Sequence, residues 1–244
     1  MLHDETTDIF GWPYLVMPRM PGTCSNERSI LTMLGDAARR DVAVALANGL
    51  VELQRLSWRF AGDFDPTVTL APYPLGDTQH IVDETTRFAA SARANGAFAR
   101  DDDLWVDAAA QRALSNAPEH RYVYVHGDYK LNNLTVMPAD TGWRVSGVFD
   151  LHESRFGDGA MDLVRQTCSY LDTDAPLAAV FAQAYLRMAK HDANVAARMP
   201  LYVINDRIKI WEYFTRPDAR ADWPKRTTFR PWAERYVDGI CAVV

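Results

Sequence analysis

Three oxygen-bearing side chains in the middle of the chain have the types and spacing needed for phosphate chemistry. Asp128 and Asn133 lie in a polar loop after the apolar run 122–125, and Asp150 ends a later apolar segment. Two apolar stretches on either side of the turn-like segment 138–142 predict a β-hairpin between them. Because a hairpin folds back on itself, it can return Asp150 to the neighbourhood of Asp128 and Asn133. Such oxygen atoms suit a hard ion like Mg²⁺ that also holds phosphate oxygens.

The polar loop also offers a group for proton transfer. A carboxylate beside such an ion can orient an attacking hydroxyl group and accept its proton, and Asp128 is the candidate. The alternatives are an Asp128 that caps a turn and an Asn133 that caps a backbone group. We expect His126 to order the loop through hydrogen bonds, and we interpret Glu153 as a solvated carboxylate in preference to a contact for a cationic substrate.

The sequence around these residues resembles a known family. The string HGDYKLNNL, residues 126–134, contains the D-x-K-x-x-N spacing of the protein-kinase catalytic loop. Its glycine after the histidine is more similar to the aminoglycoside phosphotransferase and choline kinase branch of that fold. The later string VSGVFDLHESRFGDGAMDL, residues 145–163, resembles the metal-binding Asp of this branch followed by its G-D-x-x-x-D-L helix start. Either string alone would be a weak signal, but their order and hairpin-length separation argue against chance.

This resemblance implies an α+β fold: a protein-kinase-like large lobe, mostly helical, with a catalytic β-hairpin and a preceding hinge strand. It implies an ATP-dependent phosphotransferase that acts on a hydroxyl group of an aminoglycoside, choline, a sugar or an amino alcohol. Asp128 is then the catalytic base, and Lys130, whose place follows protein kinases, stabilises charge on the transferred group. Asn133 and Asp150 hold Mg²⁺ against the phosphates of the nucleotide.

The later motif contains two further carboxylates. Asp158 is well placed to cap a helix over 159–170, and Asp162 lies in its first turn, where negative charge is favoured. The resemblance implies in addition that one of the two carboxylates braces the catalytic loop. Capping and bracing do not exclude each other.

The N-terminal segment 12–20, WPYLVMPRM, predicts one strand followed by a bend. On residue types alone it reads as an edge strand packed on the core. The resemblance makes it the end of a small lobe, over residues 1–22, with the large lobe at 23–244. Its hinge residues, which would contact adenine, are then Met17, Pro18, Arg19 and Met20.

The chain departs from the family before this hinge. Kinases of this fold place a Gly-rich phosphate loop, a strand lysine and a helix glutamate there. About ten residues precede the segment 12–20 in this sequence, with neither the glycine pattern nor a lysine. Two further hypotheses follow: a catalytically impaired lobe that serves as a binding or regulatory module, and a homodimer or partner chain that covers the hinge region.

The rest of the chain is predicted to be mainly helical. Residues 60–80 contain several Gly and Pro and predict a long loop. Within the next helix, His80 and Glu84 lie one turn apart, which hints at metal binding, although we favour a surface pair because no further ligands are in spacing. Apolar periodicity predicts helices at 26–58 and 197–215. We expect further helices at 77–95, 102–116, 159–170, 174–190 and 228–242.

Composition sets the broad class. The 244 residues suffice for one large domain or two small ones, and 48% are hydrophobic, as in a globular protein. A net charge of -6 does not favour nucleic acid as a partner. No apolar run is long enough to span a bilayer, and no leader peptide is recognisable. The 3 scattered cysteines fit free thiols in the cytoplasm. The expected partners are a nucleotide and a small-molecule hydroxyl acceptor.

Overall fold

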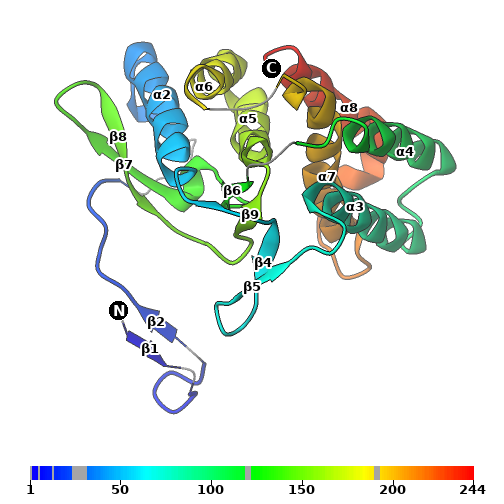
Figure 1. Ribbon diagram of the computed structural model, residues 1–244, viewed down its shortest axis with the longest axis horizontal. Helices are drawn as coiled ribbons and strands as arrows, with labels where there is room; N and C mark the ends of the chain where they lie inside the picture. Colours follow the sequence, from blue (N-terminus) through cyan, green and yellow to red (C-terminus); the bar gives the residue numbers. More distant parts are fainter. Residues whose placement is uncertain (1, 5, 13, 24–31, 119–121, 190–192) are drawn as a thin grey trace.

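The computed structural model describes residues 2–4, 6–12, 14–23, 32–118, 122–189 and 193–244. Helices fill most of the body, and short strands lie along one side of it (Figure 1). The helices are α2 (Asp36–Leu53), α3 (Asp77–Ala94), α4 (Arg100–Leu114), α5 (Asp162–Thr173), α6 (Ala175–Met188), α7 (Val195–Thr215) and α8 (Phe229–Cys241).

Two groups of helices pack side by side in Figure 1. Helix α2 packs on α6, and α6 on α5, whereas α7 packs against α3, α4 and α8. The predicted apolar face of α7 explains its central place, since Leu201, Ile204, Ile208 and Trp211 recur at helical spacing and are all buried. One continuous core of aliphatic and aromatic side chains therefore joins the helices.

A five-stranded antiparallel sheet crosses the body below the helices. Its order is β3-β6-β9-β4-β5, formed by β3 (Ser57–Trp58), β6 (Tyr122–Val125), β9 (Arg155–Gly157), β4 (Gly62–Phe64) and β5 (Leu70–Pro72). The prediction of a long loop over 60–80 is therefore wrong in part, because β4 and β5 form a hairpin there. These strands are too short for a periodic pattern, and their place depends on pairing with β9, far along the chain.

The predicted catalytic hairpin is confirmed as β7 (Leu134–Pro138) and β8 (Trp143–Val148). Helix α2 packs against β8, and Gly49 permits the contact, because a Cβ atom there would lie 2.7 Å from the Val145 side chain. The hairpin is thus pressed onto a helix that is itself part of the core.

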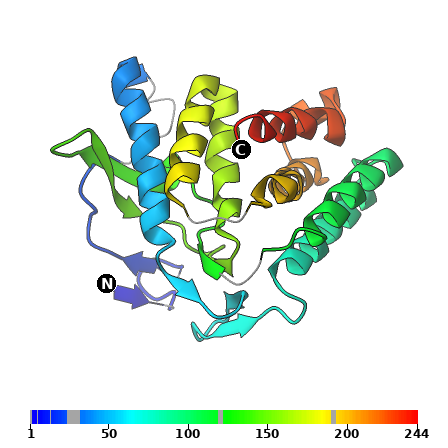
Figure 2. The same ribbon diagram turned by 45° about the horizontal axis from the view of Figure 1, so that its top comes forward.

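The N-terminal segment forms a separate hairpin of β1 (Leu2–Asp4) and β2 (Tyr14–Val16), which projects from the helical body (Figures 1 and 2). The chain then returns to β7, where Thr23 and Val136 exchange backbone hydrogen bonds of 2.9 and 3.2 Å. The predicted single strand and bend are confirmed in outline, with β2 paired to β1 and not to the core.

Other helix predictions are confirmed to within a few residues, apart from two helices. The helix expected over 26–58 begins at Asp36, after the N-cap Gly35, and ends at Leu53, so its predicted end is wrong and residues 57–58 belong to β3. Residues 26–31 lie outside the described residues. Before α5 stands a short 3₁₀ turn, η2 (Gly159–Met161). Among the described residues, no helix is long and apolar enough to cross a membrane.

Candidate active site

The catalytic loop, residues 126–133, follows β6 directly, and Asp162 at the start of α5 holds it in place. The Asp162 carboxylate accepts hydrogen bonds from the backbone N–H groups of His126, at 2.8 Å, and Gly127, at 2.9 Å. Burial raises the pKa of Asp162, and the two N–H donors act in the opposite direction. The expectation that one carboxylate of the later motif braces the loop is confirmed for Asp162.

Asp158 has the structural role that its position predicts. Its side chain accepts from the backbone N–H of Ala160 at 3.0 Å and so caps the 3₁₀ turn. It also accepts from Arg198 Nε at 2.8 Å and from the Tyr202 hydroxyl at 2.7 Å. Asp158 therefore fixes the start of α5 to α7, and Asp162 transfers that fixed position to the catalytic loop.

The Asp128 carboxylate is held by three side chains. Lys130 Nζ lies 2.7 Å from Oδ2, and Asn133 Nδ2 donates to the same oxygen at 2.8 Å. Arg165 Nε lies 3.2 Å from Oδ1 as an ion pair. The partners of this carboxylate are side chains, which is not the pattern of a turn-capping Asp. Asn133 does cap in part, since its Nδ2 also donates to the Asp128 carbonyl at 3.0 Å.

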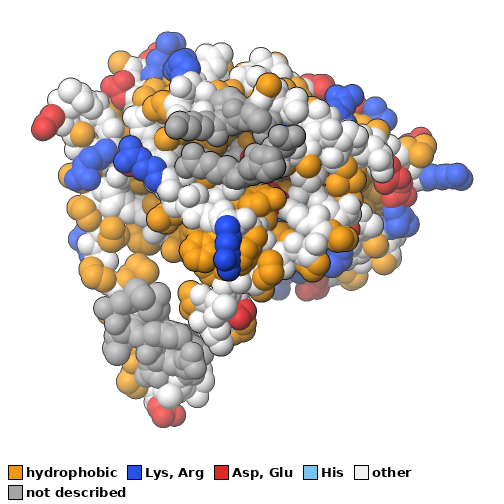
Figure 3. All heavy atoms as spheres, viewed as in Figure 1, with side chains coloured by type: hydrophobic (Ala, Val, Ile, Leu, Met, Phe, Trp, Pro, Cys, Tyr) orange, Lys and Arg blue, Asp and Glu red, His pale blue; other side chains and the backbone are white. Residues whose placement is uncertain are grey.

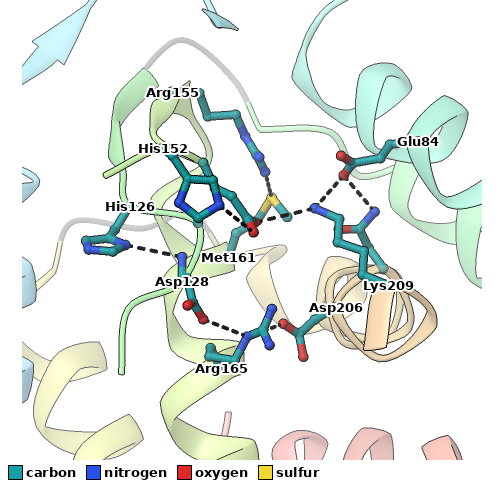
Figure 4. A network of polar contacts seen from close by, with 12 residues as sticks. Glu84, His126, Asp128, His152, Arg155, Met161, Arg165, Asp206 and Lys209 are labelled. Atoms are coloured by element: carbon teal, nitrogen blue, oxygen red, sulfur yellow. Dashed lines mark hydrogen bonds and ion pairs between the residues drawn. The ribbon is translucent and has the colours of Figure 1, made fainter. Parts of the chain in front are cut away.

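Arg165 belongs to a chain of alternating charges that the sequence did not reveal (Figure 4). Its Nε lies 2.7 Å from Asp206 on α7, and Arg207 Nε donates to the same carboxylate at 2.8 Å. Burial would raise the pKa of Asp206, but Arg165 and Arg207 outweigh it and lower that pKa. Only the tertiary packing of α5 on α7 brings these residues to Asp128, so their spacing along the chain carried no signal.

His126 joins the catalytic loop to the exit of β8. Its Nδ1 accepts from the Asp128 N–H at 3.2 Å, and its Nε2 lies 2.8 Å from the carbonyl oxygen of Phe149. Phe149 in turn donates its N–H to the Asn133 carbonyl at 2.9 Å. The predicted ordering role of His126 is thus confirmed, and the hairpin does return the residue before Asp150 to the loop.

Asp150 follows directly and adopts φ +61°, a left-handed conformation in which Asp is tolerated better than most residues. Its carboxylate is about half exposed and lies 2.7 Å from His152 Nδ1. Because Asn133 Nδ2 faces Asp128, Asn133 Oδ1 is the atom left for an ion. One carboxylate and one amide oxygen match Mg²⁺, which keeps most of its shell for water and phosphate oxygens. In the described part of the chain, no cluster of three His, Cys, Asp or Glu forms a protein-only metal cage.

The predicted hinge residues line one cavity. A pocket of ≈ 460 Å³ lies between the N-terminal segment and the hairpin, lined by Met17, Pro18, Arg19, Met20, Gly22, Thr23, Thr135 and Phe149. Ser146 Oγ donates to the Pro21 carbonyl at 2.6 Å and helps to hold this wall. Exposed hydrophobic side chains are frequent on this face of the molecule (Figure 3). Phe149, one of the residues that line the pocket, directly precedes Asp150 in the chain.

A second pocket, of ≈ 370 Å³, lies on the other side of the Asp150 loop. It is lined by Asp63, Phe64, His80, Glu84, Phe88, His152, Glu153, Ser154, Arg155 and Lys209. Glu153 packs its Cβ and carbonyl oxygen against Gly127, where an added Cβ would lie 2.7 Å from each of them. The pocket therefore adjoins the catalytic loop. The Glu153 side chain is 34% exposed and its carboxylate lies 4.0 Å from Lys209 Nζ, so the solvated carboxylate stays a prediction.

His80 and Glu84 in this wall each have a partner of their own. His80 stacks on the Tyr73 ring at 3.7 Å between centroids, and Glu84 accepts from Lys209 at 2.9 Å. Burial would raise the pKa of Glu84, but its contacts with Lys209 outweigh this and lower the pKa. The preferred interpretation, a surface pair, is wrong for Glu84, whose side chain is only 14% exposed.

Comparison with known proteins agrees with the site. The sequence profile described as the phosphotransferase enzyme family matches residues 2–201, so the chain belongs to that family. No curated protein matches it.

Solved structures with a similar fold are aminoglycoside phosphotransferases. A candidate enzyme of this kind from Ralstonia eutropha JMP134 has a TM-score of 0.63 at 16% identity, over 100% of this chain and 77% of its own. The GDP complex of aminoglycoside 2'-phosphotransferase-IIIa gives 0.60 at 13%, over 98% and 73%. A ternary complex of aminoglycoside phosphotransferase APH(4)-Ia with ADP and hygromycin B gives 0.58 at 15%, over 92% and 70%. The fold class is thus the predicted α+β, kinase-like one.

Proposed function

We propose that this protein is an ATP-dependent phosphotransferase that acts on a hydroxyl group of a small molecule. One arrangement carries the proposal: the Asp128 carboxylate is fixed beside Asn133, and Phe149, the residue before Asp150, lines the hinge pocket. A nucleotide base in that pocket would direct its phosphates toward Asp150. A base, an ion site and a nucleotide pocket in this order are what phosphoryl transfer requires.

The residues divide the work as follows. Asp128 orients the acceptor hydroxyl and takes its proton, and Lys130 adds positive charge near the transferred group. Asn133 Oδ1 and Asp150 would hold Mg²⁺, which supplies charge neutralisation on the phosphates when bound. Asp162 and His126 keep the loop in place, so that little reorganisation is needed during transfer.

Two of the structural neighbours were solved with GDP or ADP, which supports a nucleotide as one substrate of this protein. ATP as the donor is our proposal. We also propose that residues 1–22 supply the hinge and a remnant of a small lobe, and that 23–244 form the large lobe. The acceptor classes that remain in view are aminoglycosides, choline, sugars and amino alcohols.

A direct experiment is Mg-nucleotide turnover across these acceptors, with product detected by phosphorus NMR. We expect ATP-dependent phosphorylation of at least one acceptor by the full chain, together with a rise in melting temperature on adding Mg-ATP. The matched control is Asp140→Asn, in the exposed turn of the hairpin. Equal turnover by Asp128→Asn would contradict the proposal. Absence of both turnover and nucleotide stabilisation would instead favour a binding or regulatory module.

A further inference from the structure

Arg155, on β9, is a buried cation with few partners. Only 4% of its surface is exposed. Within the part of the chain that the structure describes, its one side-chain hydrogen bond runs from Nη2 to the sulfur of Met161 at 2.7 Å, and its Nε is buried without a partner. A thioether is a weak acceptor, whereas a guanidinium has five N–H donors. A buried charge of this kind normally has oxygen acceptors around it.

The guanidinium lies between the second pocket and the catalytic loop. Arg155 lines the ≈ 370 Å³ pocket and also a narrow cavity of ≈ 20 Å³ that Gly127, Arg165 and Lys209 share. Figure 4 shows its side chain extending from β9 toward Met161, on the side of Glu84 and Lys209. A ligand in the second pocket can therefore contact Arg155, and the narrow cavity that shares Arg155 is lined by Gly127, the residue before Asp128.

Several acidic groups keep Arg155 charged without a hydrogen bond to its Nε. Burial would lower the pKa of Arg155, but Asp77, Tyr73, Glu84 and Asp162 together outweigh this and raise it. Asp77 itself uses one oxygen to accept from the Asp158 N–H. The other cation in the pocket, Lys209, is paired with Glu84. Asp63 and Glu153 line the same pocket as Arg155 and form its acidic side. Asp63 also accepts a hydrogen bond from the Tyr73 hydroxyl.

We infer that the second pocket binds an acceptor that carries an anionic group, a carboxylate or a phosphate monoester, with that group on the Arg155 guanidinium. This inference rests on the proposed function and names its acceptor class. Charge-assisted contacts from a guanidinium to a planar carboxylate or to phosphate are strong and directional. The acidic side formed by Asp63 and Glu153 suits an amino group on the same molecule. A hydroxy amino acid supplies all three groups: a carboxylate for Arg155, an amino group for Asp63 and Glu153, and the hydroxyl group that accepts the phosphoryl group.

The test uses acceptors that differ by the anionic group alone. Serine is compared with ethanolamine, homoserine with 3-aminopropanol, and glycerol 3-phosphate with glycerol, in transfer from labelled ATP by the full chain. We expect kcat/KM to be at least about tenfold higher for the anionic member of one pair, and the pair affected distinguishes a carboxylate from a phosphate. Neutral acceptors that react as well as their anionic partners would overturn the inference and leave the proposed function intact.

Variants and direct binding separate the remaining outcomes. Arg155→Lys and Arg155→Gln should remove the preference for the anionic acceptor, whereas Arg87→Gln, an exposed arginine on α3, should retain it. Since a change at Arg155 can impair folding, calorimetry on the unchanged protein provides a second measurement. Serine or glycerol 3-phosphate should bind more tightly than its neutral partner without nucleotide. Such binding without any transfer would refute the phosphotransferase and keep the anion site, and absence of this selectivity would refute the site.

Discussion

The two carboxylates of the candidate site occupy contrasting environments. The Asp128 side chain is 10% exposed and is held by Lys130, Asn133 and Arg165. The Asp150 side chain is 48% exposed, and only His152 contacts it among the described residues. The backbone has hydrogen bonds near both residues, from the Asp128 N–H to His126 and from the Phe149 N–H to the Asn133 carbonyl oxygen. The contrast between the two residues therefore lies in the contacts of their side chains.

This contrast fits the two roles. A base must present one orientation to each acceptor, so the protein supplies its contacts in advance. A metal ligand obtains most of its contacts from the ion and from the phosphates, and Mg²⁺ tolerates only near-ideal geometry. An exposed carboxylate on a fixed backbone allows that adjustment. Substitutions at the two positions should consequently have different effects on activity and on stability.

The largest effect is expected at Asp128. Asp128→Asn keeps the shape of the side chain but removes the proton acceptor, so kcat should fall by about 10²–10⁴-fold. Steady-state kinetics with Mg-ATP measures the loss, and Asp140→Asn should leave kcat unchanged. A fall of less than about tenfold would assign Asp128 to loop structure and would remove the contrast in roles.

A third carboxylate, Asp77, tests the effect of burial on the pKa of a carboxyl group. Burial raises the pKa of Asp77 to about 6, from 3.8. Between these values the folded protein binds a proton more tightly than the unfolded chain, so stability falls as pH rises from about 4 to 6, by about 3 kcal/mol from this group. Asp77→Asn should remove this part of the pH dependence in urea unfolding. Asp83→Asn, exposed on the same helix, should retain it, and identical curves for all three proteins would contradict the assignment.

Gly127 tests how rigid the catalytic loop is. It has φ +82°, and an added Cβ would lie 2.7 Å from both Glu153 Cβ and the Glu153 carbonyl oxygen. Gly96 has φ +72° and open space around it, so Gly96→Ala shares the backbone strain without the clash. Gly127→Ala should therefore lower the free energy of unfolding by about 1–3 kcal/mol more than Gly96→Ala. Equal losses would show that the loop yields, and the contrast with Asp150 would weaken.

The smallest effect on the fold is expected at Asp150. Asp150→Asn tolerates the left-handed backbone and removes an exposed charge, so the free energy of unfolding should change by less than about 0.5 kcal/mol. Activity should fall at least about tenfold and recover in part at high Mg²⁺, because the ion loses its carboxylate ligand. A Mg²⁺ titration of both proteins measures this. An unchanged Mg²⁺ dependence would place the ion elsewhere.

The sequence predicted the parts of the fold that local pattern determines. Apolar periodicity located α7 and most of α2, and the two apolar segments on either side of the turn-like 138–142 located the hairpin. The strands β4, β5 and β9 were missed because three residues cannot show a period, and their pairing is decided by chain segments far apart. The motif also located Asp128, Asn133 and Asp150. Arg155, Arg165 and Asp206 could not be found, since helices and strands bring them together only after folding.

His126 has a consequence for motion. One imidazole ring lies within hydrogen-bonding distance of the backbone N–H of Asp128 and of the carbonyl oxygen of Phe149, so it links the proposed proton acceptor to the residue before the proposed ion ligand. Under the proposed function, a hinge that closes over a nucleotide would leave this link, and the spacing of the two carboxylates, as it was. The distance that the transferred phosphate spans would then be set when the chain folds, and not when the substrate arrives.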